Sequence, residues 1–194
     1  GLVGKLDEAN LQRVAATEAF ASSVERLIGQ IQEGMPITPA KYAYSDRMAA
    51  AEALREQLNE TNLITPAQVQ AYTDLLVKEN QIAHSTEYFF ANLPLTDEFG
   101  NTTKKWCECV MKGNWAVYYR SLDNKNVGVY TNLGTTEAPL WGFKENLPAR
   151  VQKEVADDVI ANRVPDFAAK LQVLAQKEAS ESSETGFQAK YNSL

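Results

Sequence analysis

The sequence predicts an α+β protein that is mainly helical: an antiparallel bundle of about four helices, with a three-stranded antiparallel β-meander inserted between the third and the fourth helix. Two observations predict this fold. Apolar residues recur at helical spacing up to about residue 92 and again after about residue 147. Between about residues 104 and 143, valine, tyrosine, tryptophan and threonine dominate, and turn residues interrupt them.

The first helix is expected at about residues 5–33. Its apolar residues follow spacings of four, three and four, which place them on one helix face: Phe20, Val24, Leu27 and Ile31. Gly34 and Pro36 then end the helix.

The second helix is expected at about 38–59 and the third at about 65–92. Each begins with Thr-Pro, which places an N-capping threonine before a proline in the first helical position. In the second helix this threonine is Thr38. In the third, Thr65 and Gln68 have the spacing of a capping box. The connections are short, so these helices are expected to run antiparallel.

Three strands are expected in the middle of the chain, at about 104–111, 114–121 and 127–132. Lys-Gly-Asn and Asp-Asn-Lys-Asn separate them and favour tight turns, so the strands should form an antiparallel meander. The segment "PLWGF" at 139–143 fits either a short fourth strand or a packing loop.

The last helix is expected at about 147–178, where it would close a single domain formed by residues 1–178. Pro165 lies inside its apolar stripe and predicts a kink or a break. Residues 179–194 are rich in serine and glutamate, which is typical of a flexible tail.

Composition excludes some classes of function. The net charge is −6 and the pI is about 4.9, which argues against sequence-independent binding to nucleic acid and against docking on anionic lipid. No apolar run approaches the roughly 18–20 residues of a membrane span, so we expect no integral membrane segment. The sequence begins at Gly1 rather than methionine, which leaves an exported or periplasmic origin open. The compartment stays unknown.

The two cysteines, Cys107 and Cys109, are the obvious candidates for a metal or redox site. In a strand they share one face with Met111, and their Cα atoms lie about 6.5–7 Å apart, at the limit for a disulfide. A zinc site needs about four ligands, but the chain offers two cysteines and one histidine. We therefore expect half-buried free thiols and no metal, with a strained or intermolecular disulfide as the alternative.

No catalytic residue or cofactor can be nominated from the sequence. His84 is the one histidine, and its neighbour Ser85 does not face it on a helix. Walker, dinucleotide-binding and nucleophile-elbow motifs are absent. A packing or capping role is the favoured interpretation of His84.

All three tryptophans and several tyrosines fall in the β region. Alternation predicts that Trp115, Val117 and Tyr119 pack on the helices. A second group is the candidate binding surface for a partner or ligand: Tyr118, Arg120 and Tyr130, which would face outward or line a groove, together with Trp141. The alternative is that these rings form the core of a small sheet.

Three functions stay open, in this order. The first is a non-enzymatic interaction or assembly protein, such as a structural subunit, a secretion or virion component or an adaptor, that binds a protein partner or itself. The second is a sensor or carrier with a small-molecule pocket between the β-layer and the bundle. The third is an enzyme of unrecognised type.

Overall fold

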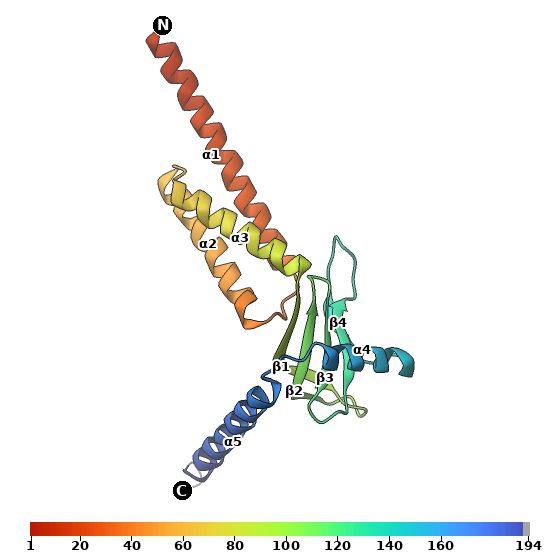
Figure 1. Ribbon diagram of the computed structural model, residues 1–194. Helices are drawn as coiled ribbons and strands as arrows, with labels where there is room; N and C mark the ends of the chain where they lie inside the picture. The colour runs from red at the N-terminus through yellow and green to blue at the C-terminus, as the bar shows by residue number, and fades with distance from the viewer. Residues whose placement is uncertain (192–194) are drawn as a thin grey trace.

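The computed structural model describes the backbone of residues 1–191 and the side chains of residues 1–181. The described residues form five α-helices and a five-stranded antiparallel sheet (Figure 1). The helical elements are α1 (Leu2–Glu33), the 3-10 helix η1 (Ala40–Tyr42), α2 (Tyr44–Thr61), α3 (Pro66–His84), α4 (Ala149–Ala161) and α5 (Phe167–Tyr191). The strands are β1 (Thr86–Thr96), β2 (Thr102–Lys112), β3 (Ala116–Ser121), β4 (Val127–Asn132) and β5 (Trp141–Lys144). The α+β class is confirmed, whereas the predicted numbers of about four helices and three strands were wrong.

The sheet is a meander in which each strand pairs with the next, in the order β1-β2-β3-β4-β5. The three predicted strands correspond to β2, β3 and β4. The segment at 139–143 contributes β5, which pairs with β4, so the strand was the correct alternative there.

The main error lies in residues 86–92, which we predicted as the end of the third helix. α3 ends at His84, and β1 pairs with β2 along its whole length. Phe89 follows Ile82 at a helical spacing of seven, which misled the prediction. The fully buried residues of β1 are instead Leu93 and Leu95, two apart, as a strand requires. Pairing with a long neighbouring strand therefore overrides a local helical pattern.

Two predictions about the helices are confirmed. Val24, Leu27 and Ile31 are buried along one face of α1. At the start of α3, Thr65 and Gln68 make both hydrogen bonds of the capping box.

The second helix begins later than predicted. The Thr38 hydroxyl donates to the Tyr42 carbonyl at 2.8 Å, and Pro39 precedes η1 rather than α2. α2 starts only at Tyr44. The Thr-Pro pair therefore shapes the connection instead of capping the helix.

The last predicted helix is two helices. Residues 162–166, which include Pro165, separate α4 from α5, so the proline accompanies a break rather than a kink. α4 packs on β2, β3 and β4 instead of joining a four-helix bundle. α5 continues to Tyr191, so residues 179–191 are helical where we expected a tail. Its flexibility stays a prediction, and residues 192–194 lie outside the described part of the chain.

The sheet has two faces with different partners. The inner face packs against Met35, Tyr42 and Ile82, which come from the α1–α2 connection and the end of α3. The outer face is covered by α4, as the ion pair between Lys112 and Asp158 shows. The inner face carries these buried residues: Cys107, Cys109, Met111, Val117, Tyr119 and Tyr130.

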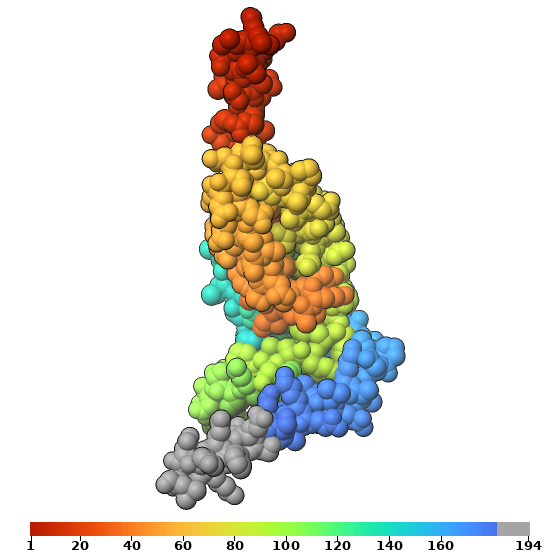
Figure 2. Space-filling model, turned by 90° about the vertical axis from the view of Figure 1, so that its left-hand side faces the viewer, coloured from red at the N-terminus to blue at the C-terminus, as the bar shows by residue number. Residues whose placement is uncertain are grey.

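A second core lies among the helices. It joins α1, α2 and α3 through buried residues such as Ile28, Leu54 and Leu75, while Ile82 of α3 belongs to the sheet core. Figures 1 and 2 show that the first turns of α1 project beyond the α2–α3 hairpin. Figure 1 shows that α5 lies at the opposite end of the molecule. None of the helices in the described part of the chain is both long and apolar enough to cross a membrane.

Candidate functional site

The four residues nominated from the sequence do not form one surface. The register pairs Val117 with Tyr130, and Tyr130 with Phe143, on the inner face. Tyr118 and Arg120 lie on the outer face, so grouping Tyr130 with them was wrong. Tyr130 is buried and stacks on Trp141, with ring centroids 6.1 Å apart. The structure brings together two pairs, one on each side of the sheet.

The residues that we expected to pack on the helices are also divided: Trp115, Val117 and Tyr119. Val117 and Tyr119 are buried on the inner face, as expected. Trp115 lies in the β2–β3 turn, is 54% exposed and meets Tyr118 edge to face.

The cysteines share the inner face with Met111, as the strand geometry predicted. Cys107 and Cys109 are free and completely buried, rather than half-buried. Burial raises the pKa of the Cys107 thiol to about 12 and also raises the pKa of Cys109. Both sulfurs are therefore protonated at neutral pH and behave as small hydrophobic groups.

His84 lies in the last turn of α3 and is exposed. Its Nδ1 is 2.9 Å from the carbonyl oxygen of Asn80. This contact is local to the helix and brings no nucleophile to the ring.

A buried carboxylate on the outer face escaped the sequence analysis. Glu108 of β2 is 1% exposed. Its oxygens accept hydrogen bonds from Arg163 at 2.6 and 2.9 Å, from Arg120 at 3.2 Å and from the Tyr88 hydroxyl at 2.7 Å. The available signal was the position of Glu108 between apolar strand residues. Its partners lie 12, 20 and 55 residues away, which no local pattern connects.

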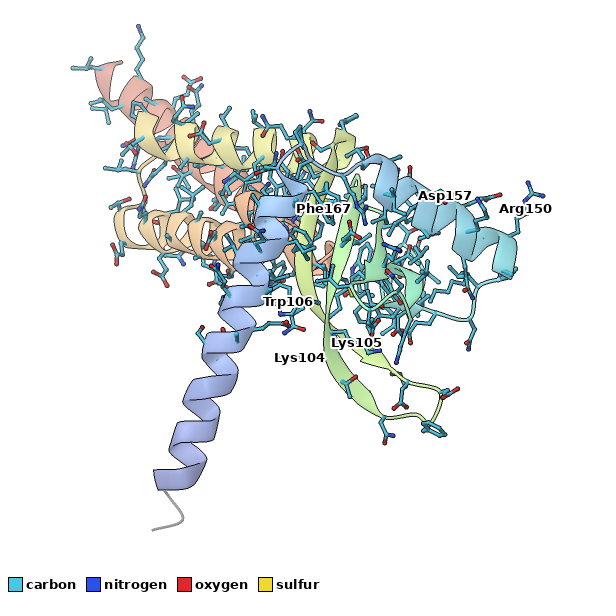
Figure 3. All side chains as sticks on the ribbon, turned by 60° about the horizontal axis from the view of Figure 1, so that its bottom comes forward. Lys104, Lys105, Trp106, Arg150, Asp157 and Phe167 are labelled. Atoms are coloured by element: carbon cyan, nitrogen blue, oxygen red, sulfur yellow. The ribbon has the colours of Figure 1, made fainter. Side chains whose placement is uncertain are left out.

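We name Glu108 and its partners Tyr88, Arg120 and Arg163 the Glu108 cluster, which fixes the start of α5 to the sheet. Burial raises the pKa of Glu108. The hydrogen bonds from Arg163 and Tyr88 and the two guanidinium charges lower this pKa by more than burial raises it, so the net shift is downward. Arg163 also lies over the Phe167 ring, 4.1 Å from its centroid, and the Phe167 and Tyr88 rings meet edge to face. Figure 3 labels Phe167 at the start of α5. A carboxylate whose pKa is lowered and whose two oxygens are both hydrogen-bonded suits a structural role better than that of a proton donor or acceptor.

A cleft of about 560 Å³ separates the helices from one end of the sheet. It lies between the last turns of α1 and α3 on one side and the β2–β3 turn and the β4–β5 hairpin on the other. Trp115 and Trp141 line the sheet side, and Glu33, Arg47 and Glu79 line the helical side. Of the nominated residues, Trp141 alone lines this cleft.

The walls of the cleft are held by polar contacts. The Arg47 guanidinium, although almost fully buried, binds the Glu79 carboxylate at 2.6 Å and the Tyr42 carbonyl at 2.9 Å. The Trp141 indole N–H donates to the Glu33 carbonyl at 2.9 Å, across 108 residues of sequence. The Arg47 bonds hold the helical wall together, and the Trp141 bond connects β5 to the end of α1.

The projecting half of α1 is a third feature. Leu2, Val3 and Leu6 are exposed there, and we name them the α1 stripe. Arg13 donates to the Asn62 carbonyl at 3.5 Å, where α1 passes the α2–α3 turn. Among the described residues, neither hydrophobic core includes the α1 stripe.

No metal centre emerges from the described residues, among which no three His, Cys, Asp or Glu side chains are placed to hold an ion. The features that remain are the cleft, the Glu108 cluster and the α1 stripe. Their interpretation depends on their own geometry. Comparisons with protein-family models, with curated proteins and with solved structures find no match to this chain.

Proposed function

We propose that this chain is a non-enzymatic assembly protein that associates with a second copy of itself through the α1 stripe. The observation that carries the proposal is that Leu2 and Leu6 are exposed on the helix face of α1 that is buried further along the helix. Leu6 and Val24 are 18 residues apart, which is five full turns at about 100° per residue, so they point the same way. Val24 is 1% exposed and Leu6 is 57% exposed.

Leu2, one turn before Leu6, also lies on the face of α1 that is buried further along the helix. Leu2 lies 18 residues before Phe20, which packs against the helical core. Leu2 and Leu6 therefore lie on the helix face that binds α2 and α3 further along α1, but in the described part of the chain they belong to neither hydrophobic core. Exposed apolar surface of this kind is typical of a protein interface.

The charge of the projecting segment favours a second copy as the partner. Residues 2–17 contain two cations, Lys5 and Arg13, and two acids, Asp7 and Glu8, so their net charge is zero. The whole chain carries −6. Two copies that meet at this segment therefore avoid the repulsion between their acidic bodies.

Contact area also favours a symmetric pair. One short helix contact falls below the roughly 1,200–2,000 Å² of a stable interface. In a dimer with a two-fold axis, every contact occurs twice, so the buried area doubles. Exposed Val69, Leu76 and Val77 on α3 give the partner's helical layer further apolar surface.

The proposal is tested by measuring molecular mass with sedimentation equilibrium. The wild type is expected to form dimers, and the double variant Leu2→Gln/Leu6→Gln to weaken the dimer more than about tenfold, because each buried leucine contributes roughly 1.5–3 kcal/mol. Leu11→Gln is the matched control: Leu11 is 72% exposed but lies about 140° around the helix from Leu6.

Two results would overturn the proposal. One is a wild-type chain that stays monomeric at millimolar concentration. The other is a dimer that Leu11→Gln weakens as much as the double variant does, since the stripe would then have no special role.

A further inference from the structure

The charges in the cleft do not balance. Among the described residues that line it, Arg47 is the one cation, and its guanidinium is bound to Glu79. Glu33 also lines the cleft, is exposed and makes no ion pair with any described residue. One carboxylate charge therefore remains without a partner in the cleft.

The end of α1 adds negative potential at the same place. α1 ends at Glu33, and its last turn contains no basic residue. The carbonyl end of a helix carries about half a negative charge, so an acidic residue there is unfavourable unless a cation offsets it. The fold thus places a carboxylate and a helix C-terminus together on one wall of a cleft.

The opposite wall provides aromatic surface. Trp115 is half exposed, and Trp141 is anchored by its N–H bond to the Glu33 carbonyl and by stacking on Tyr130. The faces of indole rings attract cations, more strongly than those of other aromatic side chains. A cleft of about 560 Å³ also falls within the usual size range of ligand sites.

We propose that this cleft binds an organic cation, an ammonium or guanidinium group, on the indoles of Trp115 and Trp141 and the carboxylate of Glu33. Arg47 does not compete for that carboxylate because its own bonds to Glu79 and Tyr42 hold it in the wall. The cation can come from a free amine or from a lysine or arginine side chain of a peptide. This site is independent of the α1 stripe, which lies at the other end of α1.

The three tryptophans allow a direct test by NMR, because each indole N–H gives its own signal. The first probe is cadaverine, with 1,5-pentanediol as its uncharged match. Cadaverine is expected to shift the Trp115 and Trp141 signals saturably and to leave Trp106, which does not line the cleft, unchanged. Pentanediol is expected to shift none of them.

A peptide probe separates the two sources of the cation. It is a glycine pentapeptide with one central lysine, compared with the same peptide carrying acetyl-lysine. Tighter binding of the lysine peptide than of cadaverine assigns the site to a protein side chain, and the reverse order assigns it to a free amine. Both orders support a cation site.

The variant Glu33→Gln tests the carboxylate. It leaves the backbone carbonyl that binds Trp141 intact and is expected to weaken binding of the cation probes roughly tenfold, as the loss of one charge-assisted contact should. Glu8→Gln, at the far end of the same helix, removes the same charge and is expected to leave binding unchanged.

Three outcomes would overturn the inference. They are no saturable shift of Trp115 and Trp141 with either cation up to tens of millimolar, equal shifts with pentanediol, and Glu33→Gln binding as tightly as the wild type.

Discussion

Glu108 and Arg47 are the two charged side chains that are buried in the described part of the chain. Each is paired: Glu108 with two arginines and a tyrosine, Arg47 with Glu79 and a backbone carbonyl. Burying a charge is tolerable only with such partners, because an unpaired ion loses its hydration without compensation. The two residues play different roles, since Glu108 joins α5 to the sheet and Arg47 forms a wall of the cleft.

Replacing Glu108 by alanine should strongly destabilise the protein. The change leaves Arg163, Arg120 and the Tyr88 hydroxyl without their common partner. Breaking a buried ion pair in this way typically costs about 3–5 kcal/mol. The free energy of unfolding, measured by urea denaturation, is expected to fall by that amount.

Glu154→Ala is the matched control, because Glu154 forms an exposed ion pair on α4 with Arg150. Figure 3 labels Arg150. Its loss should cost less than about 1 kcal/mol. Equal losses for the two variants would refute a stabilising role for the Glu108 cluster.

The stabilisation by Glu108 also depends on pH. Folding lowers the pKa of Glu108, so its contribution to the free energy of unfolding is present above the unfolded pKa of about 4.3 and is lost as pH falls through the folded pKa.

At the scale of elements, local chemistry decided the start of α3 but not its end. The capping box of Thr65 and Gln68 depends on residues three apart, so the sequence revealed it. The end of α3 depends on β1, which exists because β2 offers a partner strand. The break at Pro165 is intermediate, because proline forbids a regular helix while the surrounding packing decides between a kink and a break.

Thr65→Ala should destabilise the protein through the loss of this cap. The backbone N–H of Gln68 loses its acceptor, and the expected cost is about 1 kcal/mol. Thr73→Ala, eight residues later on the same helix, is the control. The Thr73 hydroxyl bonds the Val69 carbonyl within the helix, and alanine is the better helix former, so this variant should be neutral or slightly stabilising. Urea denaturation of both variants checks the sign, and a larger loss for Thr73→Ala would contradict the capping role.

At the scale of the whole molecule, two hydrophobic cores share one helix. Leu75 of α3 belongs to the helical core, and Ile82, two turns later, belongs to the sheet core. Trp141 adds a hydrogen bond from β5 to the end of α1. These links favour unfolding as a single unit, and the single domain of residues 1–178 stays a prediction.

Leu54→Ala tests whether the two cores are coupled. Leu54 is buried among the helices, and its truncation should cost about 2–5 kcal/mol. Circular dichroism at 222 nm reports mainly the helices, whereas all three tryptophans lie in the β region. Both signals are expected to shift to the same lower urea midpoint. A fluorescence midpoint that stays at the wild-type value would show two independent units.

The candidate sites show the same division between local and tertiary information. Alternation along β2 placed Cys107 and Cys109 together, and ligand counting argued against zinc, because both arguments need only one segment. The error at Tyr130 arose because the face of a residue in β4 depends on its register with β3. Neither the cleft nor the Glu108 cluster lies within one segment.

The sequence by itself determined the α+β class, the apolar face of α1, the cap of α3 and the strands from β2 to β4. Each depends on residues a few positions apart, whose spacing fixes a helix face, a cap or a strand face. Tertiary structure alone decided that residues 86–92 form a strand, that α4 covers the sheet, and that Trp115, Trp141 and Glu33 line one cleft. The physical reason is that strand pairing and burial act between segments far apart in the chain, where local periodicity carries no signal.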